Sequence, residues 1–304
     1  METVVIPTFV NGLIDGGTLF LVAVGLNLIF GVMGVLNVAH GSFYAIGAFA
    51  AASAWGLLAA AHVTPWLTFP ALFVIAAAIG GTCGPLVERS LLRFTYAAES
   101  RTQAESLQLL ITYALFLVLE DVQKMVWGVQ PYYTGQALLL LGRSRIAGLS
   151  YTNYQLLLIP LAAAVFLALR WFLRRAAAGR FVVAVIESPD MAYAMGINVG
   201  WVRGFAFALG TALAALGGAL SSPTIGVSIG IGADMAVLSF AVAAVGGLGQ
   251  IEGAVIASLI IGIAHALAVF VFPELSSVAP FVIMLVVLLF KPYGLMGVPQ
   301  RRRI

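Results

Sequence analysis

The stretch FVNGLIDGGTLFLVAVGLNLIFGVM, residues 9–33, is a run of 25 predominantly apolar residues. An α-helix needs about 20 such residues to cross about 30 Å of hydrocarbon, so this run alone is long enough to span a membrane. Eight further apolar runs lie at residues 40–61, 67–87, 107–127, 152–173, 204–220, 234–245, 251–272 and 278–290. Because several are short or broken by glycine, the pattern predicts eight or nine membrane helices, some of them discontinuous.

The composition agrees with a membrane protein. Hydrophobic residues make up 62% of the 304 residues, whereas Asp, Glu, Lys and Arg together make up 9%. Soluble domains carry about 25% charged residues, which their water-facing surface requires. Soluble enzymes, nucleic-acid binders and disordered scaffolds are therefore excluded. We predict an all-α polytopic membrane protein in which residues 1–304 form a single transmembrane domain, because lipid leaves helices as the only conformation for such runs.

The basic residues predict an orientation in the membrane. Of the 15 Lys and Arg, twelve fall in three places: residues 89–101, residues 170–203 and the C-terminal residues 291–303. Loops on the cytoplasmic side retain Lys and Arg, so these three places are expected to be cytoplasmic. Nine crossings then put the N-terminus outside and the C-terminus in the cytoplasm of a bacterial inner membrane. The same rule explains the net charge of +3 without a nucleic-acid partner.

Two segments interrupt apolar helices with glycine and polar residues, GVMGVLNVAHG at residues 31–41 and GGLGQIEG at residues 246–253. Irregular backbone at membrane depth persists only where protein or a water-filled cavity covers it, and paired interruptions indicate an inverted repeat around a central pathway. As ordinary turns at the membrane surface, both would need no function. The candidate pathway-lining residues are Asn27, Gly31, Asn37, His40, Gly41, Gly246, Gly247 and Gly249.

The polar members of this set allow two interpretations. Asn27 and Gly31 lie one turn apart, which suits either a path or an interhelical hydrogen bond, and the hydrogen bond is the simpler interpretation. His40 would be a proton relay in a secondary transporter. With no carboxylate near it in the sequence, it is more simply a hydrogen-bonding group at a helix end, and we interpret His265 in the same way. A single histidine makes no metal site, and none is predicted.

Small residues recur at a spacing of four in two of the apolar runs. The lipid chains offer no hydrophobic gain for helix association, so such faces are expected to hold the bundle together by close packing. One face carries Ala206, Gly210, Ala214 and Gly218, and the other carries Ala254, Ser258, Gly262 and Ala266.

The basic segment 174–203 contains the start and stop signals of a short helix. Ser188 is a good N-cap, Pro189 suits the first helical position, and Asp190 complements the helix dipole there. Gly196 fits a left-handed stop, which gives a helix of about two turns.

A helix of two turns is not stable alone, so it must dock on the bundle or on a cytoplasmic partner. Met191, Ala194 and Met195 would form its apolar face, because they are spaced i, i+3 and i+4.

Four blocks of the sequence, taken together, resemble one transport family. They are residues 11–41, residues 179–198 with the short helix, residues 244–254 with the second interruption, and KPYGLMG at residues 291–297. In this order they resemble the shorter permease subunit of branched-chain amino acid type ABC transporters. Val38, Gln250 and Glu252 depart from the family pattern, which usually has Phe, Ser and Pro there, and this bears on the substrate more than on the family.

The resemblance implies a set of partners and a coupling role. The partners are a second permease subunit, two cytoplasmic ATP-binding subunits and an extracytoplasmic substrate-binding protein. ATP-Mg would be bound in those partners, with no cofactor in this chain. Branched-chain amino acids are the default substrate, and urea, short amides and aromatic acids are alternatives. The residues implied to couple to the ATPase are Glu187, Ser188, Pro189, Asp190, Met191, Ala194, Met195, Gly196 and Asn198.

The chain itself does not carry the signature of an enzyme. Its two lysines, Lys124 and Lys291, do not follow the glycine pattern of a phosphate-binding loop, so the ATPase must be another subunit. A rival function is a self-sufficient secondary transporter or channel, which would need an ion site from His40, Glu120 or Glu252. A third is a structural membrane subunit without a pathway. Glu120 and Lys124, spaced i, i+4 near a helix end, are expected to form an ordinary ion pair.

Overall fold

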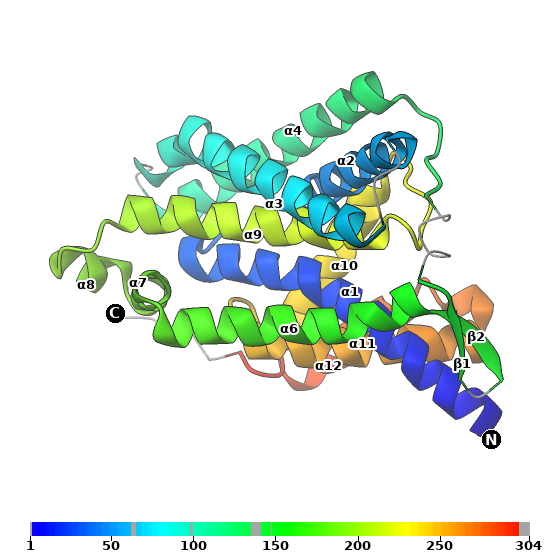
Figure 1. The fold of residues 1–304 in the computed structure, drawn as a ribbon. Coiled ribbons are helices and arrows are strands. Elements are labelled where there is room, and N and C mark those ends of the chain that lie inside the picture. The colour runs from blue at the N-terminus through cyan, green and yellow to red at the C-terminus, as the bar shows by residue number, and fades with distance from the viewer. Residues whose placement is uncertain (1, 62–64, 98–99, 135–140, 147, 298–304) are drawn as a thin grey trace.

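The structure is a computed structural model that describes residues 2–61, 65–97, 100–134, 141–146 and 148–297, so the arginines at 301–303 lie outside the described residues. Most of the described chain is helical (Figure 1). The elements are α1 (Glu2–Met33), α2 (His40–Ala60), α3 (Pro65–Ser90), η1 (Leu92–Ala97), α4 (Arg101–Trp127), β1 (Arg143–Ile146), β2 (Leu149–Thr152), α6 (Asn153–Arg175), α7 (Ala177–Glu187), α8 (Pro189–Ala194), α9 (Val199–Ser221), α10 (Ile231–Gly246), α11 (Ile251–Val271), η2 (Pro273–Leu275) and α12 (Ala279–Phe290).

Six helices of the described chain are long and apolar enough to cross a membrane, namely α1, α2, α3, α6, α9 and α11. Helices α10 and α12 are apolar but have only 16 and 12 residues. Helix α4 has 27 residues, and its last two turns carry Glu120, Asp121 and Lys124. The predicted helical, multi-spanning membrane protein is therefore confirmed. A count of eight or nine full crossings stays a prediction.

The structure corrects the all-α prediction in one place. Strands β1 and β2 pair antiparallel, with Arg143 opposite Thr152 and Ile146 opposite Leu149. Gly148 has a φ of +84°, which the turn requires and which other residues rarely adopt. Strands of four residues are too short to give a periodic signal that stands out between two long apolar runs.

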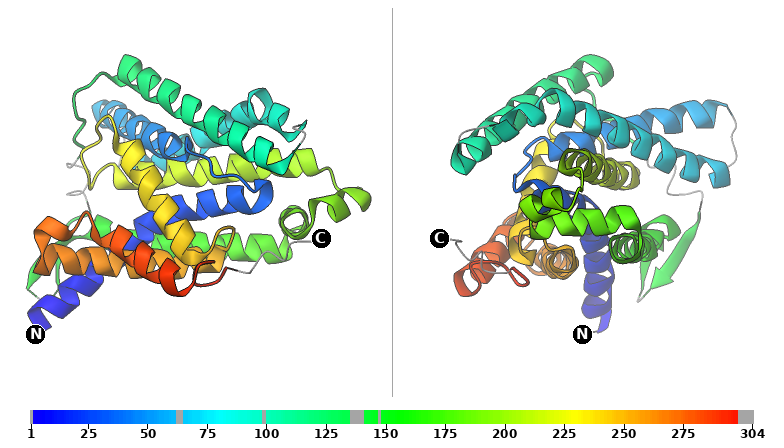
Figure 2. Two further views of the ribbon diagram at one scale, coloured as in Figure 1. Left: turned by 180° about the vertical axis from the view of Figure 1, so that it is seen from behind. Right: turned by 90° about the vertical axis from the view of Figure 1, so that its left-hand side faces the viewer.

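Helices α1 and α9 form the centre of the bundle (Figures 1 and 2). Helix α11 packs along α1, and helices α2 and α3 pack along α9, while α10 runs obliquely between the two groups (Figure 2). Being covered by neighbours explains why the middle of α1, residues 19–26, is apolar all round, with Val22, Ala23, Val24 and Leu26 fully buried.

Close helix contacts depend on the predicted small-residue faces. Every member of both faces is buried. A Cβ atom added at Gly210 would lie 2.7 Å from the carbonyl oxygen of Gly25 on α1, and one added at Gly262 would lie 2.5 Å from that of Gly12. The backbones of α9 and α11 therefore approach α1 at a distance that only glycine allows. The predicted packing role of these faces is confirmed.

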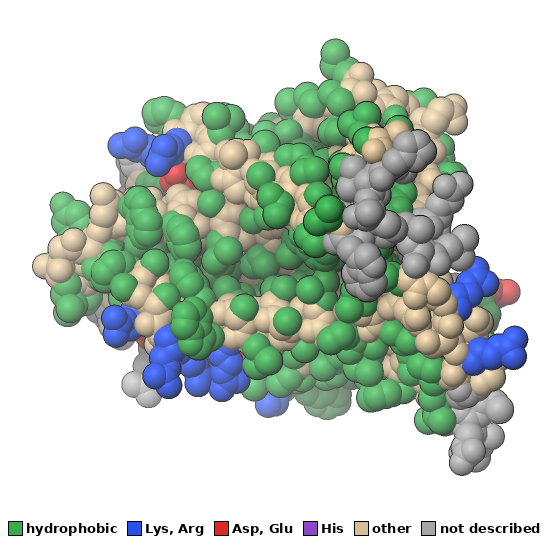
Figure 3. All heavy atoms as spheres, viewed as in Figure 1, with side chains coloured by type: hydrophobic (Ala, Val, Ile, Leu, Met, Phe, Trp, Pro, Cys, Tyr) green, Lys and Arg blue, Asp and Glu red, His purple; other side chains and the backbone are tan. Residues whose placement is uncertain are grey.

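Charged side chains gather at the two ends of the bundle, and the surface between the ends is mostly hydrophobic (Figure 3). At one end lie the last turns of α3 and α6, with Arg89, Arg174 and Arg175, next to α7 and α8. Arg143 and Arg145 lie on the hairpin at the opposite end, near the start of α1 (Figure 1). We refer to these as the arginine-rich end and the hairpin end.

Candidate functional site

The two predicted interruptions contact each other, and Asn27 of α1 joins them. Its Nδ2 donates a hydrogen bond to the backbone oxygen of Gln250 at 3.2 Å, and its Oδ1 accepts one from the backbone N–H of Gly249 at 3.2 Å. The Asn27 side chain is fully buried. The interhelical hydrogen bond predicted for Asn27 is thus present. It gives the Gly249 N–H a partner in the break between α10 and α11, whereas the Gln250 oxygen also accepts from the Ala254 N–H at 3.0 Å.

The break between α10 and α11 needs glycine for two reasons. Gly247 and Gly249 have φ angles of +103° and +81°, which other residues rarely adopt. A Cβ atom on Gly249 would also lie 3.1 Å from the Cα atom of Gly31, so the two interruptions meet backbone to backbone.

The C-terminal segment pairs with the same break. The backbone N–H of Leu295 donates to the Val245 oxygen at 2.8 Å, and that of Met296 donates to the Gly246 oxygen at 3.1 Å. Two sequence blocks that lie about 50 residues apart therefore form one structural unit at the end of α10.

His40 begins α2 and is fully buried. Its Nε2–H donates to the backbone oxygen of Val22 at 2.9 Å, which confirms the predicted role as a hydrogen-bonding group at a helix end. Gly41 packs against the Gly232 backbone of α10. Asn37 is buried in the turn that precedes α2, and its backbone oxygen accepts from the His40 N–H at 3.1 Å.

All eight candidate pathway residues lie where α1, α2, α10 and α11 converge. Gly31 and Gly249 are half-buried, and the other six are buried. In this chain they are packed among protein groups, so their role in lining a pathway stays a prediction.

The short helix α8 begins and ends as predicted. The Ser188 side chain accepts a hydrogen bond from the Met191 N–H at 3.5 Å, Pro189 is the first residue, and Gly196 has a φ of +85°. Asn198 is not part of α8. Its side chain accepts a hydrogen bond from the Trp201 N–H at 3.0 Å and forms the N-cap of α9. Helices α8 and α9 are thus two separately capped helices joined at a sharp turn.

The apolar face predicted for α8 points away from the bundle. Met191 is 62% exposed and Met195 is 79% exposed, and Ala194 is exposed as well. Tyr193, which the sequence analysis did not single out, is 76% exposed, whereas Ala192 is buried. These four exposed residues form a surface that we call the α8 face, at the arginine-rich end of the molecule (Figure 1).

A groove of about 260 Å³ lies beside the α8 face. It is lined by Phe181, Met195, Gly196, Ile197, Asn198, Trp201 and Val202. Glu187 and Asp190 are exposed close by in the sequence. The predicted coupling residues therefore lie together around one exposed, partly apolar surface.

Helix α7, which precedes α8, was missed by the sequence analysis. Its Gly179, Val182 and Val185 are buried and repeat every three residues, a signal that was present in the sequence. This stripe packs against α6, α9 and α1. Helix α7 therefore anchors the α8 face to the bundle.

The three candidates for a coupling-ion site have separate partners. Lys124 lies 3.1 Å from both Glu120 and Asp121, which confirms the predicted Glu120–Lys124 pair. Glu252 pairs with Arg174 at 3.5 Å, where α11 begins at the arginine-rich end. His40 binds a backbone oxygen, as described above.

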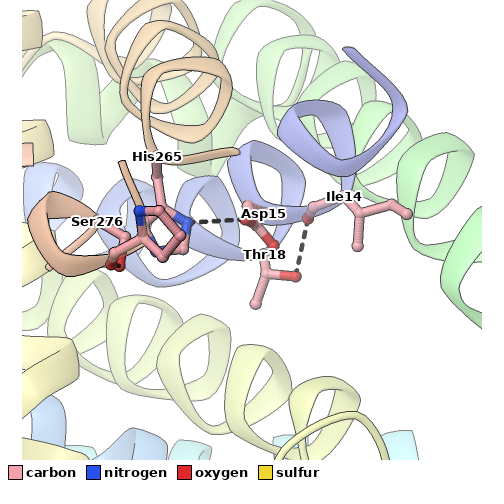
Figure 4. A network of polar contacts seen from close by, with 6 residues as sticks. Ile14, Asp15, Thr18, His265 and Ser276 are labelled. Atoms are coloured by element: carbon pink, nitrogen blue, oxygen red, sulfur yellow. Dashed lines mark hydrogen bonds and ion pairs between the residues drawn. The ribbon is translucent and has the colours of Figure 1, made fainter. Parts of the chain in front are cut away.

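The interpretation of His265 as a helix-end group is wrong. It lies six residues before the end of α11, and its Nδ1 is 3.0 Å from Oδ2 of Asp15 on α1 (Figure 4). The His265 and Asp15 side chains are 38% and 40% exposed. The sequence analysis missed this ion pair because its partners are 250 positions apart.

Comparisons with known proteins identify the family of this chain. Residues 8–288 match the family described as the branched-chain amino acid transport system / permease component. The chain is 31% identical to the high-affinity branched-chain amino acid transport system permease protein LivH of Escherichia coli K12, covering 97% of this chain and 96% of that protein. It is 29% identical to BraD of Pseudomonas aeruginosa, with the same coverage.

Among solved structures, PsaBC from Streptococcus pneumoniae in complex with Fab matches 91% of this chain and 90% of that chain. The TM-score is 0.47 and the sequence identity is 13%. The family match covers most of the chain, and the curated relatives match it almost end to end. This chain belongs to the branched-chain amino acid transport system permease family.

Proposed function

We propose that this chain is the transmembrane permease subunit of an ATP-driven importer for branched-chain amino acids or a related small organic solute. Its partners would be a second permease subunit, two cytoplasmic ATP-binding subunits that bind ATP-Mg, and an extracytoplasmic substrate-binding protein. The chain would contribute the membrane pathway and no ATP hydrolysis. Family membership supports the permease role.

The observation that carries the proposal is the exposure of the α8 face. Three large apolar side chains, Met191, Tyr193 and Met195, are each more than 60% exposed on the six-residue helix α8 or at the residue that directly follows it. Large apolar side chains grouped on a surface are typical of a protein interface. Because the arginine-rich end is the predicted cytoplasmic end, the partner at this surface would be a cytoplasmic subunit.

The packing supports a route by which such a partner moves the pathway. Helix α7 connects α8 to α6, and the turn at Gly196 connects α8 to α9. Helix α9 crosses α1 at Gly25 and Gly210, and α1 carries Asn27 to the glycine-rich break. A displacement of the α8 face on ATP binding would move α9 and α1 as rigid helices and open one end of the path while sealing the other.

The proposed topology follows from the same surface. The arginine-rich end, including the coupling segment 174–203, would face the cytoplasm of a bacterial inner membrane. The hairpin end and the N-terminus would face outward, where the substrate-binding protein docks. The whole chain would form a single transmembrane domain.

Replacing Met191 and Met195 together by Asp tests the proposal. We expect the double variant to lose co-purification with the ATP-binding subunit in detergent, because two charges would be buried at the interface. Met125→Asp is the matched control, since Met125 is 86% exposed and lies at the end of α4, near the hairpin end. Normal co-purification of the double variant would refute the proposal.

A further inference from the structure

The Asp15–His265 pair lies within two membrane helices, and it is the starting point of this inference. Both helices are among the six that are long and apolar enough to cross a membrane. His265 is six residues, or about 9 Å, from the end of α11 at the hairpin end, and fourteen residues, or about 21 Å, from its start. An ionisable pair at this depth is costly in lipid, which makes it a candidate for a functional position.

The pair belongs to a polar face that is larger than two residues. Asn11, Asp15 and Thr18 are all half-buried and are spaced i, i+4 and i+7, so they line one side of α1. We call Asn11, Asp15, Thr18 and His265 the outer polar face.

The outer polar face points away from the lipid-facing side of α11. With 3.6 residues per turn, each residue advances about 100° around a helix. Ile256, Ile260 and Leu267 are exposed apolar residues of α11, and they lie about 180°, 140° and 160° around the helix from His265. His265 shares its side with the buried Ser258 and Gly262, which pack toward α1.

The same separation holds on α1. Its exposed apolar residues Ile6 and Phe9 lie about 180° and 120° from Asp15 around the helix. Asn11 and Thr18 lie within about 60° of Asp15. Most of the exposed apolar residues of both helices therefore point away from the polar side chains. Val5 and Val269 are the exceptions, exposed at about 80° from Asp15 and about 40° from His265.

We propose that the outer polar face lines the water-filled outer mouth of the pathway and binds the polar head of the solute. The proposal rests on the proposed transport function and adds a chemical requirement to it. Asp15 offers a carboxylate and Asn11 an amide oxygen, which accept hydrogen bonds from an ammonium or amide group. The Nδ1–H of His265 donates to Asp15. When the ring is also protonated at Nε2, the Nε2–H donates to a carbonyl or carboxylate oxygen of the same solute.

This arrangement selects among the candidate substrates. Amino acids, amides and urea carry N–H donors next to a C=O acceptor. They therefore match both the acceptors of the face, on Asp15 and Asn11, and its donor, on His265. An aromatic acid brings a carboxylate for His265 and no N–H donor for Asp15 or Asn11, so it matches only one part of the face. The face therefore selects N–H-bearing solutes over anionic acids.

The first test measures water access in vesicles that contain this subunit alone. Cys83, the only cysteine of the sequence, is first replaced by Ser so that no other thiol reacts. In this background, Thr18→Cys and Asn11→Cys should react with a membrane-impermeant thiol reagent that is added outside. Leu267→Cys, on the lipid-facing side of α11, should stay unreactive as the matched control. Absence of labelling at both polar-face positions would overturn the proposal. This test needs no ATPase, so it is independent of the proposed function.

The second test measures uptake of labelled leucine by the transporter reconstituted from this chain and all of its proposed partners. Asp15→Asn should lower uptake at subsaturating leucine by about tenfold or more, because a charge-assisted hydrogen bond is lost. Asp234→Asn, a change at an exposed carboxylate outside this face, should leave uptake unchanged.

Unchanged uptake by Asp15→Asn, with normal labelling at Thr18→Cys, would overturn the binding role. Benzoate uptake equal to leucine uptake in the unaltered transporter would overturn the proposed selectivity. If the unaltered transporter takes up no solute at all, the proposed function is wrong. The difference in labelling between the polar-face cysteines and Leu267→Cys then still shows whether water reaches the outer polar face.

Discussion

Replacing Asn27 by Ala should destabilise the subunit by about 1–3 kcal/mol. The change removes both hydrogen bonds that close the glycine-rich break, each 3.2 Å long. Interhelical hydrogen bonds in membrane bundles contribute about 0.6 kcal/mol each on average, and net values in soluble proteins reach about 1.5 kcal/mol. Two such bonds give about 1–3 kcal/mol. The Gly249 N–H loses its partner, whereas the Gln250 oxygen still accepts from the Ala254 N–H at 3.0 Å, so the expected loss lies toward the middle of that range.

Equilibrium unfolding in mixed detergent micelles, followed by tryptophan fluorescence, measures this loss. Gln250→Ala is the control, because Asn27 binds the backbone oxygen at that position and not the side chain. We expect Gln250→Ala to change the free energy of unfolding by less than about 0.5 kcal/mol, as most substitutions away from buried contacts do. An Asn27→Ala variant as stable as the unaltered chain would refute the claim that the Asn27 side chain stabilises the break between α10 and α11. An equal loss in the free energy of unfolding for Asn27→Ala and Gln250→Ala would also refute this claim.

Three further predictions concern packing, capping and surface charge. Gly210→Ala should lower thermal stability in detergent by several degrees, because the new methyl group meets the Gly25 oxygen, whereas Gly81→Ala, with no atom within 4 Å, should not. Ser188→Ala should weaken α8 by about 1 kcal/mol and lower transport-coupled ATP hydrolysis without changing the fold, as judged by circular dichroism. Glu252→Gln should change the free energy of unfolding by less than about 1 kcal/mol, because its pair with Arg174 is exposed, and a larger loss would show that the pair is structural.

The helical architecture could be predicted from the sequence because lipid restricts the backbone so strongly. In water, an apolar run such as residues 9–33 would leave several conformations open. In a bilayer only a helix satisfies its backbone groups, and α1 indeed ends at Met33. The α8 signals were equally local, since a cap at Ser188 and a stop at Gly196 need no knowledge of the rest of the chain.

The features that the sequence did not predict depend on contacts between distant residues. His265 was assigned to a helix end because its carboxylate partner lies 250 positions away on α1. Asn27 was expected to line a path or, more simply, to form an interhelical hydrogen bond. Its partners, the backbone groups of Gly249 and Gln250, could not be named because they meet Asn27 only when α1 packs on the break. Helix α7 was overlooked because its stripe is short and lies in a basic segment that resembled a loop.

Uptake by vesicles tests the central claim, that a separate ATPase drives this bundle, most directly. Purified subunit alone would be reconstituted and given an inward proton or sodium gradient together with labelled leucine. A second set of vesicles would contain this subunit together with the second permease and the ATP-binding subunits. The substrate-binding protein would be added on the side where it docks, and ATP-Mg on the side of the ATP-binding subunits. We predict leucine accumulation only in the second set and only with ATP. Gradient-driven accumulation by the subunit alone would contradict the claim.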